Sequence, residues 1–257
     1  MIPLSVTLAV LFYGLCVGSF LNVCIYRVPI SRSIVRPGSA CPSCGTPIRW
    51  YDNIPVVSYL ILMGRCRACK TRVSIRYPAI EALTGGAALV SLYAFGPSPS
   101  ALVHFLFYSV LITLTFIDID HRIIPDVISL PGIPLFFLLS IAVPTLSWQD
   151  AALGILIGGG SLWLIAWLYE RATGKAGMGG GDIKLLGMMG AFIGWKGVLF
   201  TVFFSSLTGS VIGLSIMLVQ RGNMKMAIPY GPFLAAGGVV YTLFGARLIG
   251  WYFGLMN

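Results

Sequence analysis

Apolar residues occupy most of the chain in long blocks, which short polar or glycine- and proline-rich stretches interrupt. A transmembrane helix needs about 20 mostly apolar residues. By this measure the sequence predicts eight membrane-spanning helices, at 3–23, 79–96, 101–119, 126–144, 151–170, 183–194, 197–219 and 231–254. The sixth block is short and is compatible with a half-inserted helix. The predicted fold class is an all-α polytopic membrane protein.

Composition supports this class. The chain has 257 residues, is 57% hydrophobic and 10% charged, and has a mean hydropathy of +0.90. A soluble domain is nearer half apolar and about one quarter charged. The N-terminus is apolar from its second residue and has no basic residues ahead of the apolar block. This favours a retained first span over a cleaved signal peptide.

The basic residues indicate an orientation. Eight spans place the loops 24–78, 120–126, 171–182 and 220–230 on one side, and 15 of the 17 basic residues lie in or beside these loops. The positive-inside rule makes that side cytoplasmic and puts both termini outside. The net charge of +9 does not indicate nucleic-acid binding, because the sequence has neither a basic groove nor an aromatic stacking platform.

The loop 24–78 is the one insert that reads as extramembrane. It is too small for a large core and needs a covalent or metal staple. It contains two C-x-x-C pairs with 21 residues between them, Cys41 and Cys44, then Cys66 and Cys69. This spacing is typical of a structural four-thiolate zinc site, and a reducing cytoplasm would preserve the thiols. Two disulfides or a redox site are the alternatives.

Two carboxylates are candidates for catalysis. Asp182 follows three glycines, 179–181, at the mouth of an apolar segment, and Asp118 closes the third predicted span. Ionisable groups at the edge of the hydrocarbon are functional candidates by default. Both are predicted at the same membrane face, so they can meet and share one proton. One could then activate water while the other protonates the leaving group.

Other interpretations of the acids stay open at this point. Asp118 and Asp120 differ by about 200° around a helix, so only one of them can face a given partner, and Asp118 is the deeper. Both members of the pair could instead form ion pairs with Lys or Arg at the interface. Asp52 and Asp150 are expected to be solvated loop residues, and Asp126 to favour the dipole of a helix start.

The chain resembles the bifunctional type IV prepilin peptidases, also called leader peptidase/N-methyltransferases. The resemblance runs nearly the full length and includes, in order, GSFLNVCIYRVP (18–29), the two cysteine pairs, NIPVVSYL (53–60), RYPAIEALTG (76–85), FIDIDHRIIPD (116–126), GMGGGDIKLLGMMGAFIG (177–194) and PYGPFLAAG (229–237).

The resemblance implies a GxGD-type aspartic protease of the bacterial inner membrane. It would cut the basic leader from prepilins or pseudopilins at the cytoplasmic face. It would then methylate the new N-terminus with S-adenosylmethionine. Asp118 and Asp182 match the catalytic aspartates, and Cys41, Cys44, Cys66 and Cys69 match the paired knuckles. The implied domains are a first helix (1–23), a zinc insert associated with methylation (24–78) and a peptidase domain (79–257).

The methyl-donor site stays unassigned, because no glycine-rich dinucleotide signature is present. Gly18, Ser19, Asn22 and Glu81 border the insert and are either ligands or helix-end polar groups. A basic cytoplasmic face should also repel a basic leader. We expect lipid phosphates or nearby acids to offset this, the candidate acids being Asp52, Glu81, Asp120 and Asp126.

Three other functions compete with the bifunctional enzyme. The first is a peptidase whose zinc insert only docks partners. The second is a small proton-coupled transporter, which predicts internal repeats and acids near the midplane. The third is a non-catalytic assembly platform. The sequence assigns no oligomeric state.

Overall fold

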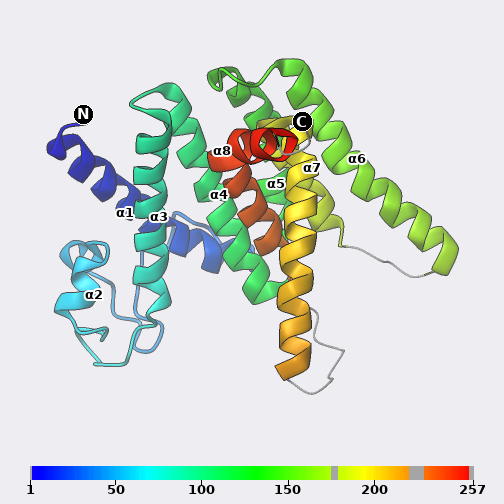
Figure 1. The fold of residues 1–257 in the computed structure, drawn as a ribbon. Helices are drawn as coiled ribbons and strands as arrows, with labels where there is room; N and C mark the ends of the chain where they lie inside the picture. The colour runs from blue at the N-terminus through cyan, green and yellow to red at the C-terminus, as the bar shows by residue number, and fades with distance from the viewer. Residues whose placement is uncertain (1, 175–178, 220–228, 255–257) are drawn as a thin grey trace. The chain divides into compact units, whose positions relative to one another are not determined.

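The computed structural model describes residues 2–174, 179–219 and 229–254, and regular structure in them is helical (Figure 1). Its elements are α1 (Leu4–Arg27), the 3-10 helix η1 (Trp50–Asn53), α2 (Val57–Ile61), α3 (Arg76–Phe95), α4 (Pro99–His121), α5 (Asp126–Leu139), the 3-10 helix η2 (Ser140–Ala142), α6 (Trp148–Thr173), α7 (Gly180–Val219) and α8 (Gly231–Gly254). The all-α prediction is confirmed.

Five of the described helices, α1, α3, α4, α6 and α7, are long and apolar enough to cross a membrane. Shorter apolar helices cover Asp126–Ala142 and Gly231–Gly245. Each predicted block therefore corresponds to a helix or to part of one, and the chain is a multi-pass membrane protein. Lys175, Arg221 and Lys225, which contribute to the predicted charge asymmetry, lie outside the described residues.

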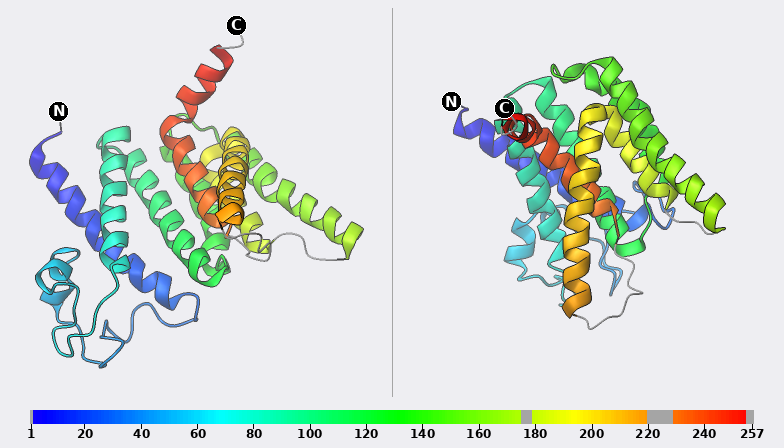
Figure 2. Two further views of the ribbon diagram at one scale, coloured as in Figure 1. Left: turned by 60° about the horizontal axis from the view of Figure 1, so that its bottom comes forward. Right: turned by 45° about the vertical axis from the view of Figure 1, so that its right-hand side comes forward.

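A backbone break at Gly194 divides α7 into two helices. Gly194 has φ +69° and ψ 177°, a combination that is essentially confined to glycine. After it the chain folds back, since the side chain of Val198 reaches to within 3.0 Å of the place where a Cβ on Gly190 would lie. The sixth and seventh predicted spans, 183–194 and 197–219, are thus two antiparallel halves of one element (Figure 2).

The first half of α7 packs against α6 through glycines. A Cβ added to Gly154 would lie 2.1 Å from the carbonyl oxygen of Gly190, and a Cβ added to Gly190 would lie 2.1 Å from the carbonyl oxygen of Gly154. Gly158 likewise faces the backbone of Leu186 at 2.6 Å. Small residues at helix interfaces let backbones approach closely, which supplies van der Waals contact where no hydrophobic effect drives association.

The second half of α7 packs antiparallel against α8. Gly237 faces Thr201, and Tyr230, just ahead of α8, hydrogen-bonds Ser205. Asp182 and Ser205 stand about equally far from the break at Gly194, roughly 17 Å of helix each. The fold-back therefore brings the beginning of α8 to the level of Asp182.

The chain forms two compact units, residues 1–113 and 114–257. In the first, α1 and α3 pack through small residues: a Cβ on Gly14 would lie 2.7 Å from Ala88, and one on Gly18 would lie 2.6 Å from the Cα of Glu81. The domain boundaries proposed from the sequence remain a prediction.

Two acids, Asp150 and Asp52, were expected from the sequence to be solvated loop residues, but the structure places both in helices with side-chain partners. Asp150 lies in the first turn of α6, where its carboxylate accepts hydrogen bonds from Ser147 at 2.6 Å and from the Trp195 indole at 2.9 Å. This contact joins the start of α6 to the second half of α7. Asp52 lies in η1 and forms a two-pronged ion pair with Arg67, which lowers the pKa of Asp52.

The glycine contact between α6 and α7 should be sensitive to a single methyl group. Gly190→Ala places a Cβ against the Gly154 carbonyl, and overpacking of this kind costs about 2 kcal/mol or more. We expect the apparent Tm of the detergent-purified protein to fall by about 5 °C. Gly160→Ala on α6 is the matched control, because a Cβ there meets nothing within 4 Å. An equal Tm for the two variants would contradict the packing described here.

Candidate functional site

Asp118 lies in the last two turns of α4 and is 6% exposed. Its Oδ2 accepts a hydrogen bond from the backbone N–H of Gly231, the first residue of α8, at 3.0 Å. A Cβ on Gly231 would lie only 2.7 Å from this oxygen. The close approach of carboxylate and backbone therefore requires glycine at 231.

Tyr230 holds the beginning of α8 in place. Its hydroxyl lies 2.7 Å from the hydroxyl of Ser205 and 3.3 Å from that of Ser206, both on the second half of α7. Gly231, which donates to Asp118, therefore directly follows Tyr230, whose side chain is hydrogen-bonded to α7. The position of the Asp118 carboxylate is coupled to the packing of α8 on α7.

Asp182 lies in the first turn of α7 and is half-buried. A carboxylate in the first turn of a helix is stabilised by the helix dipole. The glycines ahead of it allow close packing on one side, since a Cβ on Gly181 would lie 3.0 Å from the Cβ of Ile124. Gly180 has open space around it. The residues Gly177 and Met178 of the motif lie outside the described residues.

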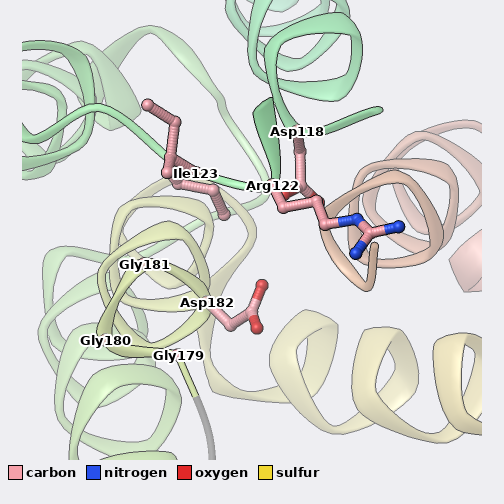
Figure 3. A pocket seen from close by; sticks show the side chains of 8 residues that line it. Asp118, Arg122, Ile123, Gly179, Gly180, Gly181 and Asp182 are labelled. Carbon is pink, nitrogen blue, oxygen red and sulfur yellow. The ribbon is translucent and has the colours of Figure 1, made fainter. Parts of the chain in front are cut away.

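The two aspartates line one cavity of about 280 Å³. Figure 3 shows the Asp182 carboxylate pointing into this space, with Asp118 and Arg122 on the opposite wall. The two carboxylates are close enough to interact electrostatically. The residues that line the cavity are Asp118, Arg122, Ile123, Ile124, Gly179, Gly180, Gly181 and Asp182.

The structure separates the candidate acids. Asp120 is exposed and does not line the cavity. Asp52 pairs with Arg67 and Asp126 pairs with Lys184, each at 2.7 Å, and neither ion pair involves the cavity aspartates. Asp118 and Asp182 are therefore not explained by pairing with Lys or Arg. Two carboxylates facing one cavity are suited to acid–base activation of water.

Sequence reasoning missed Arg122 and Gly231 as parts of this site. Arg122 directly follows α4 with φ +55°, and its N–H donates to the carbonyl of Asp118 at 2.9 Å. The signal for Gly231 was present in PYGPF, where prolines flank a glycine at a helix start. The contact between Gly231 and Asp118 spans 113 residues of sequence, so the local pattern does not predict it.

The four cysteines of the insert form a second site. Their Sγ atoms all lie within 4.8 Å of one another, and those of Cys41 and Cys69 are 3.8 Å apart. Four sulfurs around one tetrahedral zinc, at about 2.3 Å each, stand roughly 3.8 Å from one another. All six cysteines of the chain are free, so the disulfide alternative is not supported. The donor set fits structural zinc.

The two knuckles have the same backbone geometry. The N–H of Gly45 donates to the carbonyl oxygen of Cys41 at 2.9 Å, and the N–H of Lys70 donates to the carbonyl oxygen of Cys66 at 3.0 Å. Threonines follow each pair: the Thr71 hydroxyl lies 3.3 Å from the Cys69 sulfur, and hydrogen bonds from Thr71 lower the pKa of Cys69 to about 6. A thiol that ionises near neutral pH is prepared for metal binding.

The polar residues considered for the methyl donor have packing roles. Asn22 donates to the carbonyls of Gly18 and Tyr77, and the Glu81 carboxylate accepts from the N–H of Val56 at 2.7 Å. These contacts join α1, the insert and α3. They do not identify a cofactor site, and the residues that bind the methyl donor stay unassigned.

The fold and these two sites define a polytopic helical membrane protein with an aspartate pair and a four-thiol metal centre. Residues 105–214 match the family described as "Type IV leader peptidase family", and residues 12–95 match "Bacterial Peptidase A24 N-terminal domain". The chain belongs to the type IV leader peptidase family.

Curated relatives agree with this membership. The "Prepilin leader peptidase/N-methyltransferase" of Pseudomonas putida is 38% identical over 247 residues, which cover 88% of this chain and 85% of the relative. The protein of the same name from Neisseria gonorrhoeae is 41% identical over 244 residues, covering 86% and 85%. No solved structure matches the chain. Neither relative supports a proton-coupled transporter.

The metal centre can be tested directly. Replacing Cys41 and Cys44 by Ser removes two of four ligands, and we expect the zinc content to fall from about one ion per chain to near zero. Elemental analysis of the purified protein measures this. Cys16→Ser is the matched control, since Cys16 lies on α1 outside the cluster. Unchanged zinc in the double variant would count against the assignment.

Proposed function

We propose that this protein is a bifunctional enzyme that removes the leader of type IV prepilins or pseudopilins and then methylates the new N-terminal amine. The first reaction is an aspartic endopeptidase reaction carried out by Asp118 and Asp182. The methyl donor is S-adenosylmethionine, as the N-methyltransferase name of the relatives implies. The observation that carries the proposal is the single cavity that both aspartates line.

The dyad performs the cleavage with a proton shared between two carboxyl groups. The ionised carboxylate takes a proton from water, and the resulting hydroxide attacks the carbonyl carbon of the scissile bond. The protonated carboxyl group hydrogen-bonds the carbonyl oxygen and later supplies the proton that the leaving amine needs. The hydrogen bond from Gly231 orients one oxygen of Asp118, and in this proposal the other oxygen binds the water.

The substrate fits the location of the dyad. A prepilin carries a basic leader ahead of an apolar helix that lies in the bilayer, so its scissile bond lies at a membrane boundary. Asp118 is near the last residue of α4 and Asp182 near the first of α7, both of them candidate spans. We place this boundary on the cytoplasmic side of the inner membrane, on the basis of the basic loops.

The zinc insert belongs to the methylating part of the enzyme in this proposal. Zinc with four thiolates has no open coordination position, so its contribution is structural. It replaces the hydrophobic core that a short loop lacks. The insert is held to α3 by the contact between Val56 and Glu81.

One experiment tests both reactions. Purified protein is incubated with a prepilin, with and without S-adenosylmethionine, and mass spectrometry of the pilin N-terminus reports leader loss and added methyl groups. Asp118→Asn and Asp182→Asn should each lower cleavage at least about 10³-fold, because removal of one member disables a catalytic pair. Methylation of a pilin supplied without its leader should persist and shows that the variants are folded.

Asp120→Asn is the control, since its side chain lies outside the cavity. Cleavage by either cavity variant at a rate near that of the wild type would refute the dyad. Cleavage without methylation, in the presence of the methyl donor, would leave a peptidase whose insert has another role.

Gly231→Ala should impair cleavage through the position of Asp118. The added Cβ would lie 2.7 Å from Oδ2, so either the carboxylate or the start of α8 must move. We expect a fall in kcat of about 10²-fold, the loss typical of a small displacement in a catalytic site. Gly250→Ala, on the same helix, has nothing within 4 Å of its Cβ and should retain full activity. Similar rates for both variants would contradict the coupling of α8 to the dyad.

A further inference from the structure

The short helix α2 has its polar and apolar faces reversed for a loop in water. Val57, Leu60 and Ile61, at helical i, i+3, i+4 spacing, are exposed, the last two at 68% and 69%. Ser58 is buried instead, and its hydroxyl donates to the carbonyl of Tyr51 at 2.9 Å. Met63, just after the helix, is 84% exposed. A helix that buries serine and exposes leucine is suited to an apolar surrounding.

The depth of α2 is set by a contact with a membrane-spanning helix. Val56, immediately before α2, donates its N–H to the Glu81 carboxylate at 2.7 Å. Glu81 lies roughly 8 Å along the axis of α3 from Arg76, the first residue of that helix. Figure 1 shows α2 beside this end of α3. The exposed face of α2 is therefore level with the beginning of a candidate span.

The surroundings of α2 are strongly basic. The insert 24–78 contains nine basic residues and one acid, Asp52, which is engaged by Arg67. Glu81, one of the acids expected from the sequence to offset this charge, accepts a hydrogen bond from the N–H of Val56. Three exposed basic residues outside this ion pair follow α2 closely along the chain, namely Arg65, Lys70 and Arg72.

We propose that α2 is an interfacial membrane anchor that binds anionic lipid. Its apolar face, defined by Val57, Leu60, Ile61 and Met63, lies at the boundary between headgroups and acyl chains. The basic residues after it contact anionic headgroups. Apolar burial and attraction to anionic lipid are the two terms that hold amphipathic segments at an interface. The insert is then attached to the membrane by α2 as well as by α1 and α3.

A lipid partner is favoured over a protein partner by the charge and the depth together. The leader of the proposed substrate is basic and is repelled by a basic surface. Anionic headgroups are complementary in charge to the basic surface beside α2, and they lie at the depth of the first turns of α3. The inference does not depend on the peptidase activity.

A photocrosslinking experiment tests the anchor in the full chain. Benzoylphenylalanine replaces Ile61, and the protein is placed in nanodiscs of phosphatidylcholine with about 30% phosphatidylglycerol. Leu83, which is exposed on the spanning helix α3, is the positive control for lipid adducts. We expect lipid adducts at residue 61, with phosphatidylglycerol adducts at least about twofold above its mole fraction. Replacing Arg65, Lys70 and Arg72 by Gln should bring this ratio to the mole fraction.

Other products would overturn the proposal. Adducts of residue 61 with residues 114–257, with a second copy of the chain or with added prepilin would show that protein covers this face. An unreacted label, with lipid adducts still forming at residue 83, would show that α2 lies in water. Zinc content measured on each labelled protein verifies that the insert is folded, so a loss of lipid adducts can be read as a change of location.

Discussion

A carboxylate buried among membrane helices needs a hydrogen-bond donor. The packing of α8 on α7 in the second unit positions the backbone N–H that Asp118 accepts from. The donor is the first N–H of α8. It reaches Asp118 only because residue 231 has no side chain. Tyr230 fixes this point to α7 through Ser205. An unsatisfied buried carboxylate would be several kcal/mol less favourable, so the start of α8 cannot shift freely.

The fold-back at Gly194 brings the second carboxylate, Asp182, to the level of Gly231 and Asp118. The two halves of α7 return the chain to the level of Asp182, and α8 begins there. The same turn depends on α6, whose Asp150 accepts from Trp195 directly after the break. Glycines at the interface of α6 and α7 then allow backbone contact over several turns. The cavity thus follows from a turn about 18 Å away, which only a glycine can form.

The sequence predicted the helices well, because a membrane imposes a minimum length on every apolar block. It also expected Asp118 to lie deeper than Asp120, and the structure buries Asp118 and exposes Asp120. The cysteine cluster followed from spacing alone. Long-range contacts could not be predicted: nothing local connects Gly231 to Asp118, or Asp150 to Trp195. The blocks 183–194 and 197–219 were identified, whereas their packing side by side required the dihedral angles of Gly194.

The reversed pattern of α2 was missed for a different reason. Five residues are too few for a periodicity argument. Only the burial of Ser58 and the depth set by Glu81 distinguish a lipid-facing helix from a soluble one. Similarly, Asp150 looked solvated because one of its partners, the Trp195 indole, comes from another helix, whereas Ser147 is the N-cap residue of its own helix.

The central claim, that Asp118 and Asp182 act as one catalytic unit, is tested most directly by a double-variant cycle. Single-turnover cleavage of a prepilin, with enzyme in excess, gives rates for Asp118→Asn, Asp182→Asn and the double variant. Groups that work as a pair are strongly non-additive, so the double variant should be no slower than either single variant, within about threefold. Losses that multiply would show two independent contributions and would contradict a shared site.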